Sequence, residues 1–418
     1  MSGRFITLSI VSLMYISTLA IESPLSLSTA ESIAIASDPK VKAINAEVSA
    51  IRELVEASTD LPDTQVRLGL LNFPFEEGSF STEAMTQFAF GVRQMIPPRG
   101  QRSAMQEIYR ARALEKEHLI KARQNDIKLA VREAWLEAYY QDHAVDHLQE
   151  TYEHFEDLVS ISQSLYSVGT HKQEDVLLAQ VNLLRMDDRL LQTRQKQEEA
   201  YAKLGYLLNT TVNFQVGEEL PNWAIETPIE ELKVQLLNHS ETLAVFSRST
   251  QYEANMDLVS SSKNPTWAID LGYGLRDGST NTVKPRSDVI SLSISFSLPM
   301  LRNEGRNRRL QSASLLRSAA LEDRTLLLRD MEYQLDVAFS RWNTLSERLG
   351  LYTENINQQI RELAKATLTS YQNKTTELTE AIARYIEEIE HLLAIQKLRV
   401  DRLKTWAKID WLTEGKAQ

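Results

Sequence analysis

The 418 residues of this chain include no cysteine. Structural disulfides, thiolate metal sites, cysteine nucleophiles and a lipid attached to an N-terminal cysteine are therefore all excluded. Proline is scarce as well, and it is missing altogether from residues 99–219 and 300–418. Because proline breaks the interior of a helix, both stretches predict very long helices. The net charge is −11 without a long basic run, which argues against nucleic acid as a partner.

Long apolar runs are also few. Residues 1–20 are predicted to be a secretory signal peptide, because Arg4 precedes a mostly apolar stretch and residues 18–20 supply a small-residue cleavage site. A membrane anchor is the alternative, but the stretch is short and diluted by serine. No later segment has the ~20 apolar residues of a membrane helix. An exported protein is expected, and if it crosses a membrane it must do so with strands.

Four short stretches alternate between apolar residues and polar or small ones, which predicts β-strands. They cover residues 64–71, 86–96, 267–275 and 290–298. Proline ends two of them, at Pro97 and Pro299. The pairs are close enough in sequence to form two hairpins.

The last of these stretches has the cleanest alternation. Its apolar members are Ile290, Leu292, Ile294, Phe296 and Leu298, and every residue between them is serine. The pattern is typical of a half-buried strand in a soluble α+β domain, and also of a membrane barrel strand with lipid on one side and water on the other. Three companion strands and a signal peptide favour the lipid-facing interpretation.

The chain repeats itself after about 200 residues, so that Pro62 corresponds to Pro265 and Tyr166 to Tyr371. Each half is predicted to hold short helices, two strands and a long helical hairpin. The halves are residues 21–219, with the hairpin at 99–208, and residues 220–418, with the hairpin at 300–412. A period of this length indicates a duplicated domain.

The predicted elements constrain the architecture. Large apolar residues recur every seven positions from Leu321 to Leu363, which is typical of coiled-coil packing. Four strands are too few to close a barrel, for which about eight is the minimum, and lipid does not tolerate an open sheet edge. If the strands span a membrane, several copies of the chain must therefore share one barrel.

The turns of the two helical hairpins resemble those of a known family. Residues 166–170, Tyr-Ser-Val-Gly-Thr, and residues 370–375 are similar to the tip motifs of the TolC family of outer membrane efflux proteins. The duplicated plan of the whole mature chain is similar as well. In the second turn Asn373-Lys374 stands where the family often has glycine. Because asparagine tolerates the left-handed conformation that a turn needs, a turn is still expected there.

The resemblance implies a fold, a location and partners. The fold class would be an α+β membrane protein, a homotrimer with a twelve-stranded β-barrel, four strands per chain, and a long α-helical coiled-coil tunnel. It would lie in the outer membrane of a Gram-negative bacterium and extend into the periplasm. Its partners would be a periplasmic adaptor, an inner membrane pump of the RND type and outer membrane lipid, with no cofactor and no enzymatic activity. The adaptor would dock on the hairpin tips, at Tyr166, Val168, Gly169, Thr170, Tyr371, Asn373, Lys374 and Thr375.

Two further segments resemble the heavy-metal (CzcC- and CusC-like) branch of that family. They are Leu61-Pro62-Asp63 before the first strand, and Gln94 followed by residues 98–102. The resemblance implies a passive exit duct for heavy-metal cations. Drug efflux or type I protein secretion through the same duct is one alternative, and a periplasmic coiled-coil scaffold is another. A secreted enzyme is disfavoured, because no catalytic motif is present.

Two groups of side chains are candidates for ion chemistry. Asp175 and Glu380 occupy matching positions, and in a trimer they would form an acidic ring that selects cations or binds a divalent ion. Acids of a first helical turn that complement the helix dipole would look the same. His143, His147 and His154 share one helix face and are weak candidates for a transition-metal site. A solvated face of ordinary polar residues is the favoured interpretation of these histidines.

Overall fold

The structure is a computed structural model that describes residues 24–76, 78–211, 213–279, 284–299, 304–352 and 354–416. The signal peptide predicted for residues 1–20 lies outside these ranges. The chain forms two compact units, each built from matching parts of both sequence repeats. In its described part the first unit contains residues 24–39, 124–232 and 334–416, and the second contains residues 40–123 and 233–333.

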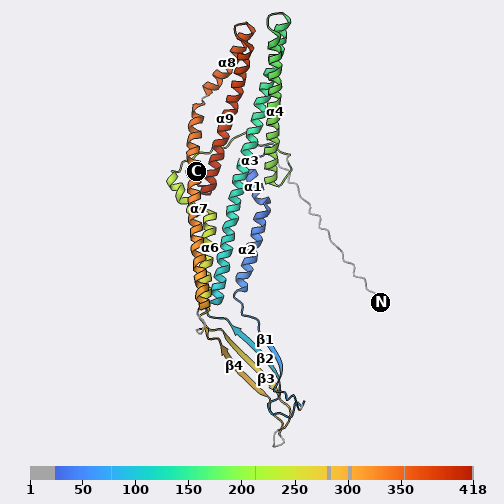
Figure 1. The fold of residues 1–418 in the computed structure, drawn as a ribbon, viewed down its shortest axis with the longest axis vertical. Helices are drawn as coiled ribbons and strands as arrows, with labels where there is room; N and C mark the ends of the chain where they lie inside the picture. The colour runs from blue at the N-terminus through green and yellow to red at the C-terminus, as the bar shows by residue number, and fades with distance from the viewer. Residues whose placement is uncertain are drawn as a thin grey trace, which may run out of the picture. The chain divides into compact units, whose positions relative to one another are not determined.

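The second unit holds all four strands in one antiparallel sheet with the order β1-β2-β3-β4 (Figure 1). The strands are β1 (Gln65–Leu71), β2 (Gln87–Ile96), β3 (Trp267–Leu275) and β4 (Val289–Phe296). The two hairpins, one from each repeat, form a single sheet because β2 pairs with β3. Leu298, predicted as a strand residue, lies beyond the end of β4, where the alternation continues in sequence but not in the ladder.

The two faces of the sheet have opposite character. One cross-strand row consists of Val66, Val92, Leu271 and Leu292, and the next of Leu68, Phe90, Tyr273 and Ile290. Most of these large apolar side chains are exposed, as are Ile294, Phe296 and Leu298. The other face carries glycine, alanine, serine and a few charged residues, as the period of two requires.

The second unit also contains helical segments, and the first of them packs through an apolar stripe. Helix α2 (Pro39–Ala57) buries five residues at helical spacing, which are Val41, Ile44, Val48, Ile51 and Val55. Helix α6 (Ser240–Ser261) is the corresponding helix of the second repeat. A short 3₁₀ helix, η1 (Leu236–Asn238), and the helix α5 (Ile229–Gln235) precede it. The long helices α3 (Gln101–Ser167) and α7 (Glu304–Leu351) contribute residues to both units.

The first unit is helical. It contains α1 (Leu27–Ser37), α4 (Gln173–Leu208), α8 (Glu354–Gln372) and α9 (Leu378–Thr413). Its core combines residues of α3, α4, α8 and α9, including Phe155, Leu158, Tyr371, Tyr385 and Ile389. None of the helices within the described residues is long and apolar enough to cross a bilayer.

The heptad seam predicted from Leu321 to Leu363 is only partly observed. Leu335, Trp342 and Leu345 are buried as expected. The helix then breaks, since α7 ends at Leu351 and α8 begins at Glu354. Beyond the break the burial register changes, so that Ala364 and Tyr371 face the core while Leu363 is exposed. A single uninterrupted arm in the second hairpin was therefore a wrong expectation.

Candidate functional site

The first hairpin tip, between α3 and α4, is closed by glycine. Gly169 has a φ of 72°, its N–H donates to the Tyr166 carbonyl at 2.9 Å, and the Thr170 N–H donates to the Leu165 carbonyl at 3.0 Å. These two bonds define a Schellman motif, which satisfies carbonyls that the end of a helix leaves unpaired. The Thr170 hydroxyl donates to the same Leu165 carbonyl.

The second tip, between α8 and α9, repeats this geometry with another residue in the left-handed position. Lys374 has a φ of 62°, its N–H donates to the Tyr371 carbonyl, and the Thr375 N–H donates to the Ser370 carbonyl at 2.9 Å. The turn expected there is thus present, but Lys374 rather than Asn373 adopts the left-handed conformation. Lys374 corresponds to Gly169 in the repeat, so the left-handed residue lies at the same position in both turns.

The two matching tyrosines of the tips lie in different environments. Tyr371 is only 1% exposed and Tyr166 is 46% exposed. The Tyr371 hydroxyl lies 3.4 Å from that of Ser162 on α3, and its ring packs edge-on against His171. Burial raises the pKa of the Tyr371 hydroxyl, so this side chain is neutral. One tip is therefore packed within the chain, and the other presents its tyrosine outward.

The two candidate acids begin equivalent helices. Asp175 is the third residue of α4 and Glu380 the third residue of α9, and the backbone N–H of each donates to the carbonyl three residues earlier. Both positions favour an acid because of the helix dipole. Glu380 also forms an ion pair of 2.6 Å with Arg384, which in turn contacts Glu387. An acidic ring would therefore include a cation beside Glu380.

Two of the three candidate histidines are engaged in separate packing contacts, and the third is partly buried. His143 packs edge-on against Tyr139 with ring centroids 4.3 Å apart, and His154 lies 5.3 Å from the ring of Tyr385. Burial lowers the pKa of His147, and nearby His143 adds to this effect. Within the described residues no group of three or more His, Cys, Asp or Glu side chains is placed to hold a metal ion.

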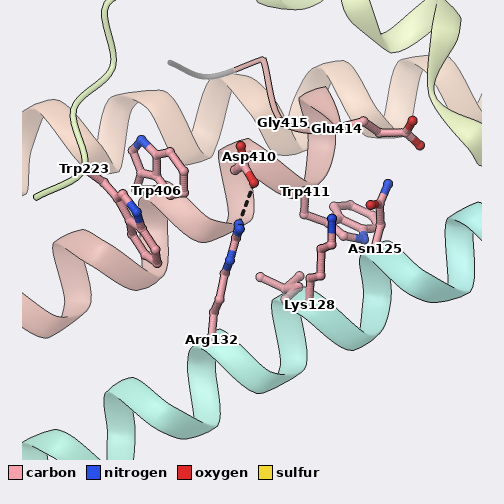
Figure 2. A pocket seen from close by; sticks show the side chains of 10 residues that line it. Asn125, Lys128, Arg132, Trp223, Trp406, Asp410, Trp411, Glu414 and Gly415 are labelled. Atoms are coloured by element: carbon pink, nitrogen blue, oxygen red, sulfur yellow. Dashed lines mark hydrogen bonds and ion pairs between the residues drawn. The ribbon is translucent and has the colours of Figure 1, made fainter. Parts of the chain in front are cut away.

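A cluster that the sequence did not reveal lies in the first unit around Arg132 of α3. Figure 2 shows its guanidinium directed at Asp410 of α9, beside Trp223 and Trp406. Nε donates to Glu31 at 2.6 Å and Nη1 to Asp410 at 2.5 Å. The two indole rings are stacked with centroids 4.3 Å apart, and the guanidinium carbon lies about 5 Å from both. The scarcity of tryptophan, six in the chain, was the signal that could have drawn attention to this cluster.

The electrostatics of this cluster are those of a structural lock. Burial lowers the pKa of Arg132, but its hydrogen bonds to Asp410 and Glu31 outweigh that effect and raise the pKa above its ordinary value. The cation is thus held firmly charged between two carboxylates and two aromatic faces. It ties α1, α3 and α9 to the segment that carries Trp223. Two charged hydrogen bonds and two aromatic faces hold the guanidinium in place, which indicates a stabilising role.

The two segments that resemble the heavy-metal branch meet in the second unit. The Gln94 amide donates to the Pro62 carbonyl at 2.9 Å and accepts from the Thr64 hydroxyl at 2.6 Å. Arg102 donates to the Thr59 carbonyl at 2.7 Å. These bonds fix the junctions by which helices enter and leave the sheet. The motif therefore has a structural purpose at this place in the fold.

Several solved structures with the same fold are described as outer-membrane channels or outer membrane proteins. The outer-membrane channel OprN is 15% identical, with a TM-score of 0.75, covering 94% of this chain and 90% of that one. CusC, whose structures concern transmembrane channel formation, is 11% identical with a TM-score of 0.77 and coverage of 93% and 91%. The outer membrane protein VceC of Vibrio cholerae is 12% identical, with a TM-score of 0.73 and coverage of 93% and 96%. The chain has the fold of TolC-like channels, which confirms the predicted fold class.

Part of the sequence also matches a known protein family. Residues 31–210 match the family described as "Outer membrane efflux protein". This part of the chain, which holds the first sheet hairpin and the first helical hairpin, carries that family's sequence pattern. The predicted resemblance is confirmed at this level, and the match does not separate one branch of the family from another. No curated protein matches the chain significantly.

Proposed function

We propose that this chain is one subunit of a homotrimeric outer membrane channel, the passive exit duct of a tripartite efflux system. A periplasmic adaptor and an inner membrane pump of the RND type would be its partners, and the pump would supply the energy. The channel would extend from the outer membrane into the periplasm. No step in this function requires a cofactor or a reaction at a protein side chain.

The sheet of the second unit carries this proposal. Its large apolar side chains are exposed on one face, which is unusual for a soluble protein unless a partner covers them. Strands β1 and β4 each have one edge without a neighbour in the sheet, and a bilayer requires such edges to be paired. Because β1 and β4 run in opposite directions, β4 of one copy can pair with β1 of the next. Three copies would then supply twelve strands.

An asymmetry between the two helical hairpins supports the same assembly. Leu177, Val181 and Leu184 form an exposed apolar stripe on α4. The matching positions of α9 are Ile382, Ile386 and Ile389, which belong to the core of the first unit or pack against it. On α8 the relation is reversed, since Leu363 is 47% exposed and its counterpart Leu158 on α3 is fully buried.

Positions that are buried in one repeat and exposed in the other are expected at a head-to-tail interface. The contact of α9 with α3 inside the chain serves as a template for a contact of α4 in one copy with α8 in the next. In this arrangement Leu184 would meet a surface that includes Leu363. Tyr166 would likewise be covered by a neighbour, as Tyr371 is covered within its own chain. Each exposed surface of one copy would thereby be covered by the matching surface of the next copy, around a closed ring.

The hairpin tips are proposed as the adaptor-docking site and as the gate. The docking residues are Tyr166, Val168, Gly169, Thr170, Tyr371, Asn373, Lys374 and Thr375. Asp175 and Glu380 would form the acidic ring near the gate, where Arg384 reduces the net charge. Replacing both acids with alanine should weaken block by divalent cations in single-channel recordings, and unchanged block would exclude the ring.

For the cargo we propose heavy-metal cations, on the resemblance of Leu61-Pro62-Asp63 and Gln94 to the metal branch. Drug efflux or protein secretion is the alternative. Deleting the gene should raise sensitivity to metal ions such as Zn²⁺ or Cu²⁺ and leave drug sensitivity unchanged. The opposite result would support a drug duct, and restoring the gene on a plasmid provides the control.

The channel itself is tested by fractionation. The protein should be recovered with the outer membrane, require detergent for extraction and migrate as a trimer that dissociates to a monomer only on heating. A soluble monomer in the periplasmic fraction would contradict the channel and favour the coiled-coil scaffold. A periplasmic marker protein and a known outer membrane protein serve as controls in the same gradient.

A further inference from the structure

The strands carry only three charged residues, and all three lie on the polar face of the sheet. They are Arg67 on β1, Arg93 on β2 and Asp270 on β3. In the ladder Arg93 is directly opposite Asp270, and Arg67 lies two positions along β1 from Gln65, the other partner of Arg93. The three side chains therefore form one patch, which is called here the charged row.

Contacts within the charged row leave it with a net positive charge. Arg67 Nη2 lies 2.8 Å from Asp270 Oδ1, while Arg93 Nε lies 3.9 Å from Oδ2 of the same carboxylate. One acid thus faces two guanidinium groups, each of which carries a fixed charge. Arg93 Nε is buried and has no hydrogen-bond partner among the described residues, so the carboxylate neutralises one arginine and only partly attracts the other.

A glycine lies beside the path from Arg67 to Asp270. The side chain of Arg67 must pass over β2 to reach Asp270 on β3, and the residue of β2 beside Arg67 is Gly91. Neighbouring strands are about 4.8 Å apart, so a long side chain on β2 would lie in this path, whereas Gly91 leaves it open. The next residue in that row, Gly272 of β3, is also without a side chain.

The surroundings of the charged row are small and uncharged. On the same face β4 contributes serine at three of its four positions, the fourth being Val289, and the other strands contribute mostly glycine and alanine. These residues are Gly69, Ala89, Gly91, Ala268, Gly272, Gly274, Ser291, Ser293 and Ser295. Neither these residues nor Gln65, which is the ladder partner of Arg93, offers a countercharge to the arginines.

We infer that the charged row makes the barrel part of the lumen favour anions, opposite to the preference proposed for the acidic ring, which belongs to the other unit; an anion-favouring barrel would weigh against free metal cations as cargo. The inference rests on the proposed trimeric barrel, in which the polar face of every sheet lines the water-filled interior. Three copies would place six arginines and three aspartates at one depth of the wall. Rings of charged side chains set the ion preference of pores, with arginine and lysine favouring anions. The Debye length at physiological salt is about 8 Å, so the effect acts on ions that pass close to the wall.

The test is the reversal potential of purified trimers in a planar bilayer under a KCl gradient at low salt. Arg67→Gln with Arg93→Gln changes the charge of the row from +1 to −1 per chain, and Asp270→Asn changes it to +2. The first variant should lower the chloride-to-potassium permeability ratio by about twofold and the second should raise it. Both shifts should shrink as the salt concentration rises.

The double arginine-to-glutamine variant and Asp270→Asn both break the ion pair between Arg67 and Asp270. If only the loss of that contact mattered, both variants would shift the chloride-to-potassium permeability ratio in the same direction. Arg67→Lys with Arg93→Lys keeps the charge and should leave the ratio at its wild-type value. Ser293→Asn, beside Asp270 in the register, controls for added volume without charge. Shifts in one direction, or ratios equal to wild type, would overturn the inference. Wild-type trimers without any conductance would instead contradict the proposed channel.

Discussion

Lys374 shows how the internal repeat determines backbone conformation at a single residue. It occupies the left-handed position that Gly169 occupies in the first tip, although a side chain makes that conformation unfavourable by roughly 1–2 kcal/mol. The two Schellman bonds around it compensate for part of this cost. The position of the turn therefore follows from the helix ends and not from the residue with the best intrinsic preference.

Lys374→Gly should stabilise the second tip by about 0.5–1 kcal/mol, because glycine removes the strain but adds freedom to the unfolded chain. Hydrogen exchange of the Thr375 amide, which donates to the Ser370 carbonyl, should slow accordingly. Asn373→Gly is the matched control one residue earlier, where φ is not positive. Faster exchange in the Lys374 variant would show that its side chain contributes contacts of its own.

Arg132 is the residue on which a buried charge network of the first unit depends. Arg132→Met would leave Asp410 and Glu31 without their shared cation, and removing one partner of a buried ion pair costs about 3–5 kcal/mol. Thermal unfolding of the protein in detergent should show this loss. Arg132→Lys keeps the charge but cannot reach both carboxylates with a planar fork, so an intermediate loss is expected. Equal stability of all three proteins would exclude a structural role for the cluster.

At the scale of elements, the sheet is defined by the difference between its faces. Strand β4 alternates between exposed apolar residues and serine, and its neighbours continue each face in register. A soluble protein would cover the apolar face with a helix or a second sheet. A barrel wall needs both faces as they are, one for lipid and one for water.

Two neighbouring residues of β4 test this assignment. Ile294→Lys would place a charge on the lipid face at a cost of about 2–4 kcal/mol per copy near the middle of the bilayer, and heat-resistant trimers in the membrane should be lost. The Ser293→Lys variant, changed on the other face, should still assemble, because water can solvate the ammonium group and Asp270 is close enough to pair with it. The assay compares the two variants by heated and unheated electrophoresis of membrane fractions. Equal assembly of both would return the strand to a soluble interpretation.

At the scale of the whole molecule, the proposed trimer would complete surfaces that one chain leaves open. Its sheet edges and the apolar stripe of α4 would pair with other copies of the same chain. Leu184 and Ile389 make this visible, since they occupy matching positions of the repeat but are 69% and 0% exposed, respectively. An aliphatic residue at matching positions is thus buried in the core in one repeat and, in the proposed trimer, would serve assembly in the other.

Leu184→Asp should leave the monomer folded but reduce the trimer more than tenfold, which corresponds to at least about 1.4 kcal/mol. Ile389→Asp should unfold the chain, because an unpaired charge in a core is strongly destabilising. Gln192→Asp, at an exposed polar position of the same helix, adds a charge without replacing an apolar residue. Circular dichroism and light scattering in detergent distinguish folding from assembly. A normal trimer in the Leu184 variant would contradict the proposed interface.

Local patterns in the sequence determined the secondary structure and the internal repeat of this protein. Period-two alternation located the four strands, the missing prolines located the long helices, and the repeat paired Tyr166 with Tyr371. These features depend on neighbours in the chain, and for that reason they are readable from a single sequence. The turn motifs were specific enough to suggest the family before the fold was known.

Only the tertiary structure decided which of two matching residues is buried, where a helix breaks and which distant side chains meet. Tyr371 and Tyr166 share a motif, but only one of them finds Ser162 and His171 beside it. The break between α7 and α8 interrupts a heptad pattern that continues in the sequence. Arg132 meets Glu31 and Asp410 across separations of 101 and 278 residues. Burial and long-range contact depend on packing among distant segments, for which local patterns contain no signal.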